Sequence, residues 1–105
     1  MNARLEERIT VPQAELDAFC RRNHVRKLAF FGSVLRDDFR PDESDVDILV
    51  EFDPEHIPGY FRLSAMEREL SAAFGRKVDL RTPGEISDYY LDRVIASSEV
   101  IYEST

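Results

Sequence analysis

The run DVDILVEF at residues 45–52 constrains the fold of this chain more than any other stretch. Its apolar residues are typical of a buried β-strand, whose side chains alternate between the two faces of a sheet. That alternation puts Asp45 and Asp47 on the opposite face from Val46 and Ile48. Because carboxylates on a buried strand are costly unless something compensates their charge, the two aspartates need a partner.

The order of helical and strand patterns predicts an α/β (α+β) fold, with a small mixed β-sheet and flanking helices. Apolar and β-branched runs indicate strands at residues 25–31, 45–52 and 76–81. The helical period indicates helices at residues 12–23, 33–39, 60–74 and 86–97. Residues 99–103 fit either a fourth strand or an extension of the last helix. The chain length suits a single domain over residues 1–105.

The charge of the chain argues against direct nucleic-acid binding. There are 21 acidic and 14 basic residues, a net charge of −7, and no dense basic run that could neutralise phosphates. An acidic site that binds an anionic substrate through a metal cation remains compatible with this charge. No apolar run approaches the ~20 residues that span a bilayer, and the first residues lack a signal-peptide pattern. We therefore expect a cytoplasmic protein with no membrane contact.

Several conspicuous residues are expected to be structural rather than catalytic. Cys20 lies on the apolar side of a helical pattern, where a buried core residue is expected rather than a reactive thiol. His24 and His56 have no Cys or His neighbour at metal-ligand spacing. A core stripe, part of which could form a partner surface, is expected from Phe61, Met66 and Leu70. Packing or interface roles are expected for Tyr89, Tyr90 and Tyr102.

Two further segments offer the acidic strand a partner. A predicted strand runs into Gly32 and Ser33, and a later predicted strand carries a lone acid, Asp79. If the three strands are neighbours, Asp45, Asp47 and Asp79 can converge at one edge of the sheet. Three clustered carboxylates resist ionising together unless a cation is present. Oxygen ligands of this kind suit Mg²⁺, so the pattern predicts a magnesium site.

The Gly-Ser turn offers groups that complement a nucleotide triphosphate. A glycine lets the backbone approach a phosphate closely, and N–H groups at a helix start favour negative charge. The hydroxyl of Ser33 can donate to a phosphate oxygen, and Arg36, one helical turn later, can reach the same anion. Two Mg²⁺ ions held by shared aspartates would serve displacement at phosphorus. Alternatively, the turn and the acids are only structural, and Asp79 is solvated or pairs with Lys77 or Arg81.

The run FGSVLRDDFRPDESDVDILVEF at residues 31–52 closely resembles the signature of the minimal nucleotidyltransferases, members of the DNA polymerase β-like superfamily. The segments GRKVDLRTP and LDRVIASSEVIYE are similar to the third strand and the C-terminal end of that family. The resemblance implies the nucleotidyltransferase fold and transfer of AMP from ATP with release of pyrophosphate. The stretch between Ser33 and Asp45 is one residue longer than the family pattern commonly has, and Glu43 is the extra residue.

The resemblance also implies a role for each motif residue. By position, Gly32 and Ser33 would hold the triphosphate of ATP, and Asp45 and Asp47 would ligate Mg²⁺. Asp79 would ligate the catalytic ion and help to deprotonate the attacking hydroxyl. These assignments agree with the site expected from the residues themselves.

The small size of the chain resembles that of the antitoxin in HEPN/MNT toxin–antitoxin pairs, of the type VII-like class. In such pairs the nucleotidyltransferase neutralises a HEPN-domain ribonuclease by adding AMP to a tyrosine hydroxyl of the toxin. The resemblance therefore implies a HEPN toxin as partner and ATP as substrate. Two other functions stay open. One is a non-catalytic antitoxin that silences its toxin by binding, and the other is a nucleotidyltransferase for a small-molecule acceptor.

Overall fold

Four strands form one sheet in the computed structural model, which describes residues 8–36, 39–40 and 45–104. The strands lie in the order β3-β2-β1-β4, with bounds Val78–Arg81, Val46–Phe52, Val25–Phe31 and Glu99–Glu103. β1 is antiparallel to β2 and to β4, whereas β2 and β3 are parallel. The predicted mixed sheet with flanking helices is confirmed, and residues 99–103 form a strand rather than an extension of the last helix.

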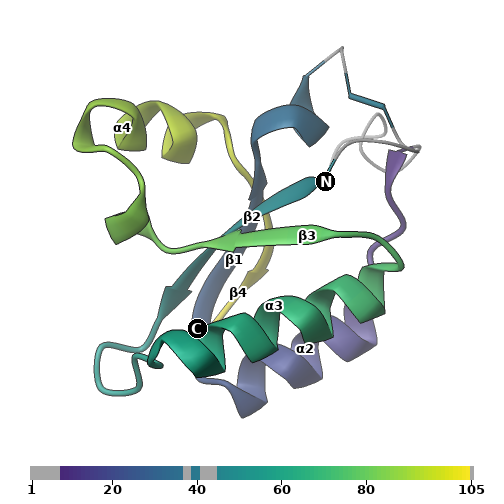
Figure 1. Cartoon of the computed structure of the whole chain (residues 1–105), viewed down its shortest axis with the longest axis vertical. Helices are drawn as coiled ribbons and strands as arrows, with labels where there is room; N and C mark the ends of the chain where they lie inside the picture. Colours follow the sequence, from purple (N-terminus) through teal and green to yellow (C-terminus); the bar gives the residue numbers. More distant parts are fainter. Residues whose placement is uncertain (1–7, 37–38, 41–44, 105) are drawn as a thin grey trace.

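Helices cover both faces of this sheet (Figure 1). α2 (Gln13–Arg22) and α3 (Tyr60–Phe74) pack side by side on one face, and α4 (Asp88–Ser97) contacts β1 on the other. Two 3₁₀ turns, η1 (Gly32–Leu35) and η2 (Pro83–Glu85), follow β1 and β3. No helix within the described ranges is long and apolar enough to cross a membrane.

The apolar side of β2 forms the centre of the hydrophobic core. Val46, Ile48 and Val50 are fully buried, and they belong to one cluster with Met66 and Leu70 of α3. The alternation predicted from the run DVDILVEF is therefore confirmed on its apolar side. This face of the sheet is closed by α2 and α3, so the acidic residues of the run are left on the face that carries α4.

The predicted core stripe of α3 is wrong at one position. Met66 and Leu70 are buried, but Phe61 is 87% exposed. Five residues make about 1.4 helical turns, so Phe61 points about 140° away from Met66 and misses the core. Cys20, in contrast, is fully buried, and burial together with the nearby charge of Asp17 raises the pKa of its thiol to about 12. It is a core residue, as expected.

The helix predicted at residues 33–39 is wrong in type and length. Among the described residues of this range the structure has only the four-residue turn η1, and Arg36 after it is extended, with φ −97° and ψ 159°; residues 37–38 lie outside the described residues. The guanidinium of Arg8 donates to the carbonyls of Val34 at 2.8 Å and of Arg36 at 2.5 Å. The carbonyl of Arg36 also accepts a hydrogen bond from the N–H of Phe39 at 3.3 Å. The last helix begins two residues later than predicted, where the hydroxyl oxygen of Ser87 caps its first turn.

The outer edge of β3 is covered by side chains of α3 rather than by another strand. The hydroxyl oxygen of Ser71 accepts a hydrogen bond from the N–H of Val78 at 3.0 Å. One carboxylate oxygen of Glu67 accepts from the N–H of Leu80 at 2.8 Å. These two bonds satisfy donors that an edge strand would otherwise present to other chains. They also fix β3, and with it Asp79, against the rest of the fold.

Replacing Ser71 with alanine is expected to lower the free energy of unfolding by about 1–2 kcal/mol, because the half-buried N–H of Val78 loses its acceptor. Ser97→Ala is the matched control. The Ser97 hydroxyl donates only to carbonyls of its own exposed helix, so its loss should change the free energy by less than about 0.5 kcal/mol. Urea denaturation of both variants measures the difference. Equal stability of the two variants would contradict this role of Ser71.

Candidate active site

The turn that follows β1 depends on a glycine at residue 32. Gly32 adopts φ +73°, in the left-handed region that side chains other than glycine disfavour. A Cβ atom at this position would lie only 2.4 Å from Oδ2 of Asp47. The close approach that the glycine permits is therefore an approach of the backbone to the Asp47 carboxylate. Sequence analysis predicted a close approach here, but to a phosphate.

Ser33 hydrogen-bonds this turn to the residues at the start of β2. Its hydroxyl donates to the backbone carbonyl of Asp45 at 3.2 Å. Its backbone N–H donates to the Asp47 carboxylate. Both donors of Ser33 are thus engaged by the segment that carries the two aspartates. A phosphate could be bound by Ser33 only if one of these bonds were exchanged.

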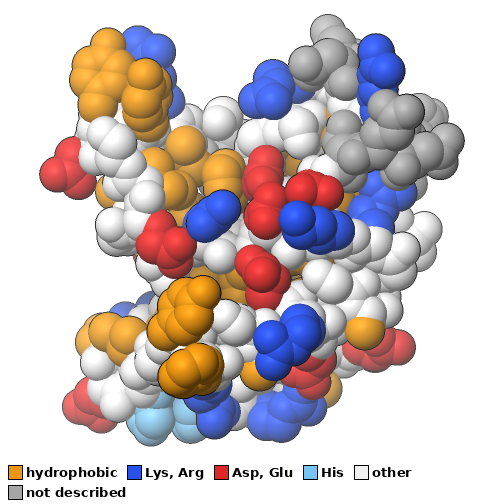
Figure 2. Space-filling model, viewed as in Figure 1, with side chains coloured by type: hydrophobic (Ala, Val, Ile, Leu, Met, Phe, Trp, Pro, Cys, Tyr) orange, Lys and Arg blue, Asp and Glu red, His pale blue; other side chains and the backbone are white. Residues whose placement is uncertain are grey.

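Strand register brings two of the three predicted acids together. Asp47 of β2 and Asp79 of β3 are direct partners in the parallel pairing, and Asp45 immediately precedes β2. All three side chains are half-buried. Figure 2 shows acidic side chains gathered in the middle of the face, over the region that β2 and β3 occupy in Figure 1. The acids lie on the face of the sheet that carries α4.

The Asp47 carboxyl has a pKa above its ordinary value. Burial is the largest cause, and the negative charges of Asp79 and Asp45 raise it further. The N–H of Ser33 and the positive charge of Arg36 offset part of this effect. An added cation beside Asp47 would therefore relieve an existing electrostatic cost.

A nucleotidyltransferase domain model matches residues 15–102, a range that contains the turn and all three acids. The chain belongs to the nucleotidyltransferase domain family. The resemblance found in the sequence is thereby confirmed at the level of the family.

The proteins and solved structures that this chain resembles are consistent with its membership of this family. Protein adenylyltransferase MntA of Thermococcus cleftensis is 35% identical over 98 residues, which cover 93% of this chain and 94% of that protein. A crystal structure described as a toxin–antitoxin with AMP-PNP gives a TM-score of 0.69 at 18% identity, over 89% of this chain and 74% of that chain. A complex of tri-AMPylated Shewanella oneidensis HEPN toxin with an MNT antitoxin gives 0.63 at 17% identity, over 89% and 71%. The two structures share the nucleotidyltransferase fold with this chain.

The acids of this nucleotidyltransferase suit a cation that is bound partly by the protein and partly by the substrate. Among the residues that the structure describes, no three His, Cys, Asp or Glu side chains are grouped so as to hold a metal ion by themselves. Mg²⁺ is commonly bound by one or two carboxylates, with waters and substrate phosphates completing its shell. The half-buried Asp47, with its raised pKa and its acidic neighbours, meets this requirement.

The basic residues next to Asp79 pair differently from what the sequence suggested. The Lys77 ammonium lies 3.6 Å from Oδ2 of Asp45, and the Arg81 guanidinium lies 3.5 Å from Oε2 of Glu85. Within the described ranges, neither is ion-paired with Asp79. The sequence could not settle this, because Lys77 immediately precedes β3, Arg81 ends it, and the partners of both come from other elements.

The turn η1 also revises two expectations about anion binding. It spans only four residues, so a helix dipole contributes little there. Arg36 follows η1, and its charge acts on Asp47. Arg8 holds the carbonyls of the turn and was missed in the sequence, because it lies 26 and 28 residues away from its partners. The extra loop residue, Glu43, lies outside the described residues.

The two histidines lie at the other end of the strands from the acids. His24 precedes β1 and His56 follows β2, and their rings stack with centroids 3.8 Å apart and an interplanar angle of 12°. The Nδ1 atom of His56 lies 3.6 Å from a carboxylate oxygen of Asp53. This position agrees with the expectation that neither histidine takes part in catalysis.

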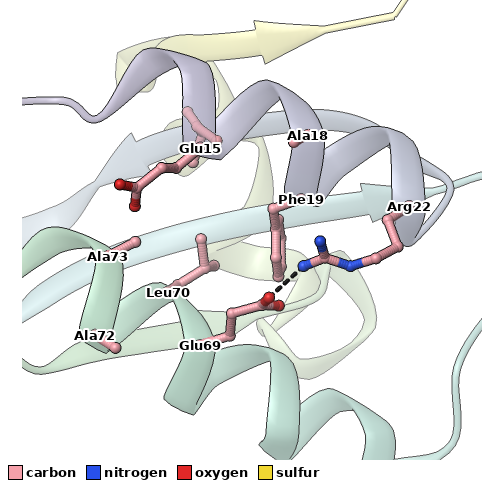
Figure 3. A pocket seen from close by; sticks show the side chains of 9 residues that line it. Glu15, Ala18, Phe19, Arg22, Glu69, Leu70, Ala72 and Ala73 are labelled. Atoms are coloured by element: carbon pink, nitrogen blue, oxygen red, sulfur yellow. Dashed lines mark hydrogen bonds and ion pairs between the residues drawn. The ribbon is translucent and has the colours of Figure 1, made fainter.

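A groove of about 420 Å³ lies between α2 and α3, on the face opposite to the acids (Figure 3). Its floor contains the buried side chains of Leu16, Phe19 and Leu70. The ion pair between Arg22 and Glu69 crosses its rim. The apolar floor suits packing contacts rather than a triphosphate, so the acidic cluster remains the candidate active site.

Proposed function

We propose that this chain is a Mg²⁺-dependent protein adenylyltransferase that transfers AMP from ATP to a tyrosine hydroxyl of a HEPN-domain toxin and so acts as an antitoxin in the cytoplasm. The observation that carries the proposal is the position of the Asp47 carboxylate, held between Asp79 and the Gly32 turn. The name of the Thermococcus relative supports the reaction. The structures with AMP-PNP and with an AMPylated HEPN toxin support the nucleotide and the partner.

In this proposal Asp45, Asp47 and Asp79 hold Mg²⁺, with two ions during the reaction. The ions would neutralise the phosphates and stabilise the charge that develops on the leaving pyrophosphate. Asp47 is prepared for this role because burial and two acidic neighbours make its ionised form costly without a cation. The absence of a side chain at Gly32 leaves room for that carboxylate beside the turn.

The remaining residues would position ATP and accept the proton of the attacking hydroxyl. The acceptor oxygen forms a bond to the α-phosphorus, the bond from that phosphorus to the bridging oxygen breaks, and pyrophosphate leaves. Asp79 takes the proton of the attacking hydroxyl. Ser33 exchanges its bonds to the aspartate segment for bonds to phosphate, and Arg36 adds a guanidinium to the same anion.

The test combines this chain, ATP and Mg²⁺ with the product of its neighbouring gene or another HEPN-domain protein, followed by intact-mass spectrometry. We expect a Mg²⁺-dependent gain of one or more AMP units on the partner. Asp45→Ala should abolish the gain. Asp17→Ala should leave it unchanged, because Asp17 lies on α2, across the sheet from the acids. A stable complex with no gain in mass would instead support an antitoxin that silences its toxin by binding alone.

A further inference from the structure

Helix α4 is poorly buried for a ten-residue element. None of its residues, Asp88–Ser97, is fully buried. Tyr89 and Tyr90 are 73% and 55% exposed and pack edge to face, with ring centroids 4.9 Å apart. Ile95 on the helix and Val100 on the following strand, β4, are each 42% exposed. An exposed pair of packed aromatic rings is typical of a surface that contacts another protein, whereas Ile95, five residues from Tyr90, points about 140° away from it.

The position of α4 relates this surface to the acids. α2 and α3 cover the opposite face of the sheet, so α4 is the helix on the acidic face within the described ranges (Figure 1). In Figure 2 the face is hollowed between the region of α4, at upper left, and the opposite upper corner, with acidic side chains below the hollow. A macromolecule that brings a side chain to these acids must approach from this face, where it meets α4.

A second exposed aromatic pair has a different position. Tyr60 and Phe61 are 78% and 87% exposed and also pack edge to face, with centroids 5.8 Å apart. They begin α3, whose later turns are anchored by buried Met66 and Leu70 on the other side of the sheet. Exposure alone therefore does not separate the two pairs, but their position relative to the acids does. The second pair provides a matched control.

The charge around α4 indicates the chemistry of what binds there. Residues 88–103 contain four acids, Asp88, Asp92, Glu99 and Glu103, against a single arginine, Arg93. The Arg93 guanidinium lies over the ring of Tyr89, 5.9 Å from its centroid. The whole chain carries a net charge of −7. A second copy of this chain would therefore be repelled, whereas an apolar surface rimmed by Lys and Arg would be attracted.

We propose that the α4 face, defined as Tyr89 and Tyr90, is the docking surface for the acceptor protein of the AMP transfer. The inference rests on the proposed function, because the acceptor is the macromolecule whose hydroxyl must reach the acids. The acceptor surface that it fits is apolar with a basic rim. Docking on α4 places that protein beside the acidic cluster, on the same face of the sheet.

The experiment compares two double variants, Tyr89→Ser with Tyr90→Ser, and Tyr60→Ser with Phe61→Ser. The acceptor used is a HEPN-domain protein. For the α4 variant we expect the KM for the acceptor to rise at least about tenfold, as for loss of aromatic anchors, with kcat and the KM for ATP unchanged. The α3 variant should retain the wild-type KM for the acceptor. Raising the NaCl concentration should raise the wild-type KM, because charge complementarity is screened.

Each other outcome overturns the docking assignment. One is an unchanged KM for the acceptor in the α4 variant, and another is an equal rise in both double variants. A third is a dimer of the chain alone that only the α4 variant dissociates, which would assign the face to a second copy. Binding of the two proteins, measured by calorimetry without ATP, separates this inference from the proposed function. Wild type that binds the acceptor but transfers no AMP would refute the proposed reaction, and the calorimetric comparison would still decide where the acceptor docks.

Discussion

Asp47→Asn is expected to lower the rate of AMP transfer by about 10³-fold or more and at the same time to raise the melting temperature at neutral pH. Activity falls because an amide oxygen is a poor substitute for a carboxylate beside Mg²⁺ and developing phosphate charge. The melting temperature rises because Asp79 and Asp45 no longer face a third negative charge. The asparagine oxygen can still accept the N–H of Ser33, so the turn should persist. We expect a rise of roughly 2–4 °C.

The pH dependence of this stabilisation follows from the direction of the pKa shift. The pKa of Asp47 is raised in the folded state, so the folded protein holds this proton more tightly than the unfolded chain does. The cost of ionising Asp47 is therefore fully present above its raised pKa and disappears as the pH falls below the ordinary aspartate value. The difference in melting temperature between Asp47→Asn and wild type should be largest at pH 7 and should vanish near pH 3.

Asp53→Asn is the matched control with the opposite sign. The pKa of Asp53 is lowered, first by the hydrogen bond from the N–H of Glu55 and also by His56. Its charge therefore stabilises the fold above the ordinary aspartate pKa, and that contribution is lost as the pH falls through the lowered value. At pH 7 the Asp53 variant should melt no higher than wild type and should keep full transfer activity. An Asp47→Asn protein that retains activity with Mg²⁺ still bound would refute the assignment of the site.

Gly32→Ala is expected to give the other large effect. A methyl group at this position would lie 2.4 Å from Oδ2 of Asp47, and the backbone of the alanine would also have to adopt φ +73°. We expect a loss of about 3 kcal/mol in the free energy of unfolding, from strain and crowding together. Displacing the Asp47 carboxylate by even about 1 Å should lower transfer by about 10²-fold. Urea denaturation and the rate of AMP transfer measure the two effects.

Gly75→Ala separates backbone strain from the contact with Asp47. Gly75 ends α3 with a similar φ of +70°, but nothing lies within 4 Å of a Cβ placed there. This variant should lose only about 1 kcal/mol of stability and should keep its activity. If Gly32→Ala and Gly75→Ala lost stability equally and both stayed active, the close approach of Gly32 to Asp47 would have no functional role.

The elements that bury an apolar face were predictable from the sequence. β1 at residues 25–31 and α3 at residues 60–74 have the predicted bounds, because β1 is dense in apolar and aromatic residues and most apolar residues of α3 follow the helical period. Phe61 was wrongly predicted to lie in the core. The helical period gives the directions of side chains relative to one another, but it does not say which direction faces the sheet. The turn η1 was predicted as a longer helix because no local residue marks its end after Leu35, and Arg8, which donates to the carbonyls of Val34 and Arg36, is distant in the sequence.

The candidate site was predictable in its residues but not in its bonds. The motif residues themselves identified Gly32, Ser33 and the three aspartates, since carboxylates on a buried strand require compensation. The sequence contains no signal that Ser33 donates to the aspartate segment or that Lys77 pairs with Asp45. Such contacts depend on strand register and on side-chain direction, which only the folded chain defines.

The measurement that tests the central claim most directly follows the two ends of ATP separately. ATP labelled at the α-phosphorus and ATP labelled at the γ-phosphorus are each incubated with the chain, Mg²⁺ and the HEPN-domain protein. The account predicts that the α label becomes bound to the HEPN-domain protein while the γ label is released in pyrophosphate, with neither event for Asp47→Asn. Transfer of the γ label to protein, or no transfer of the α label by wild type in a stable complex, would contradict it.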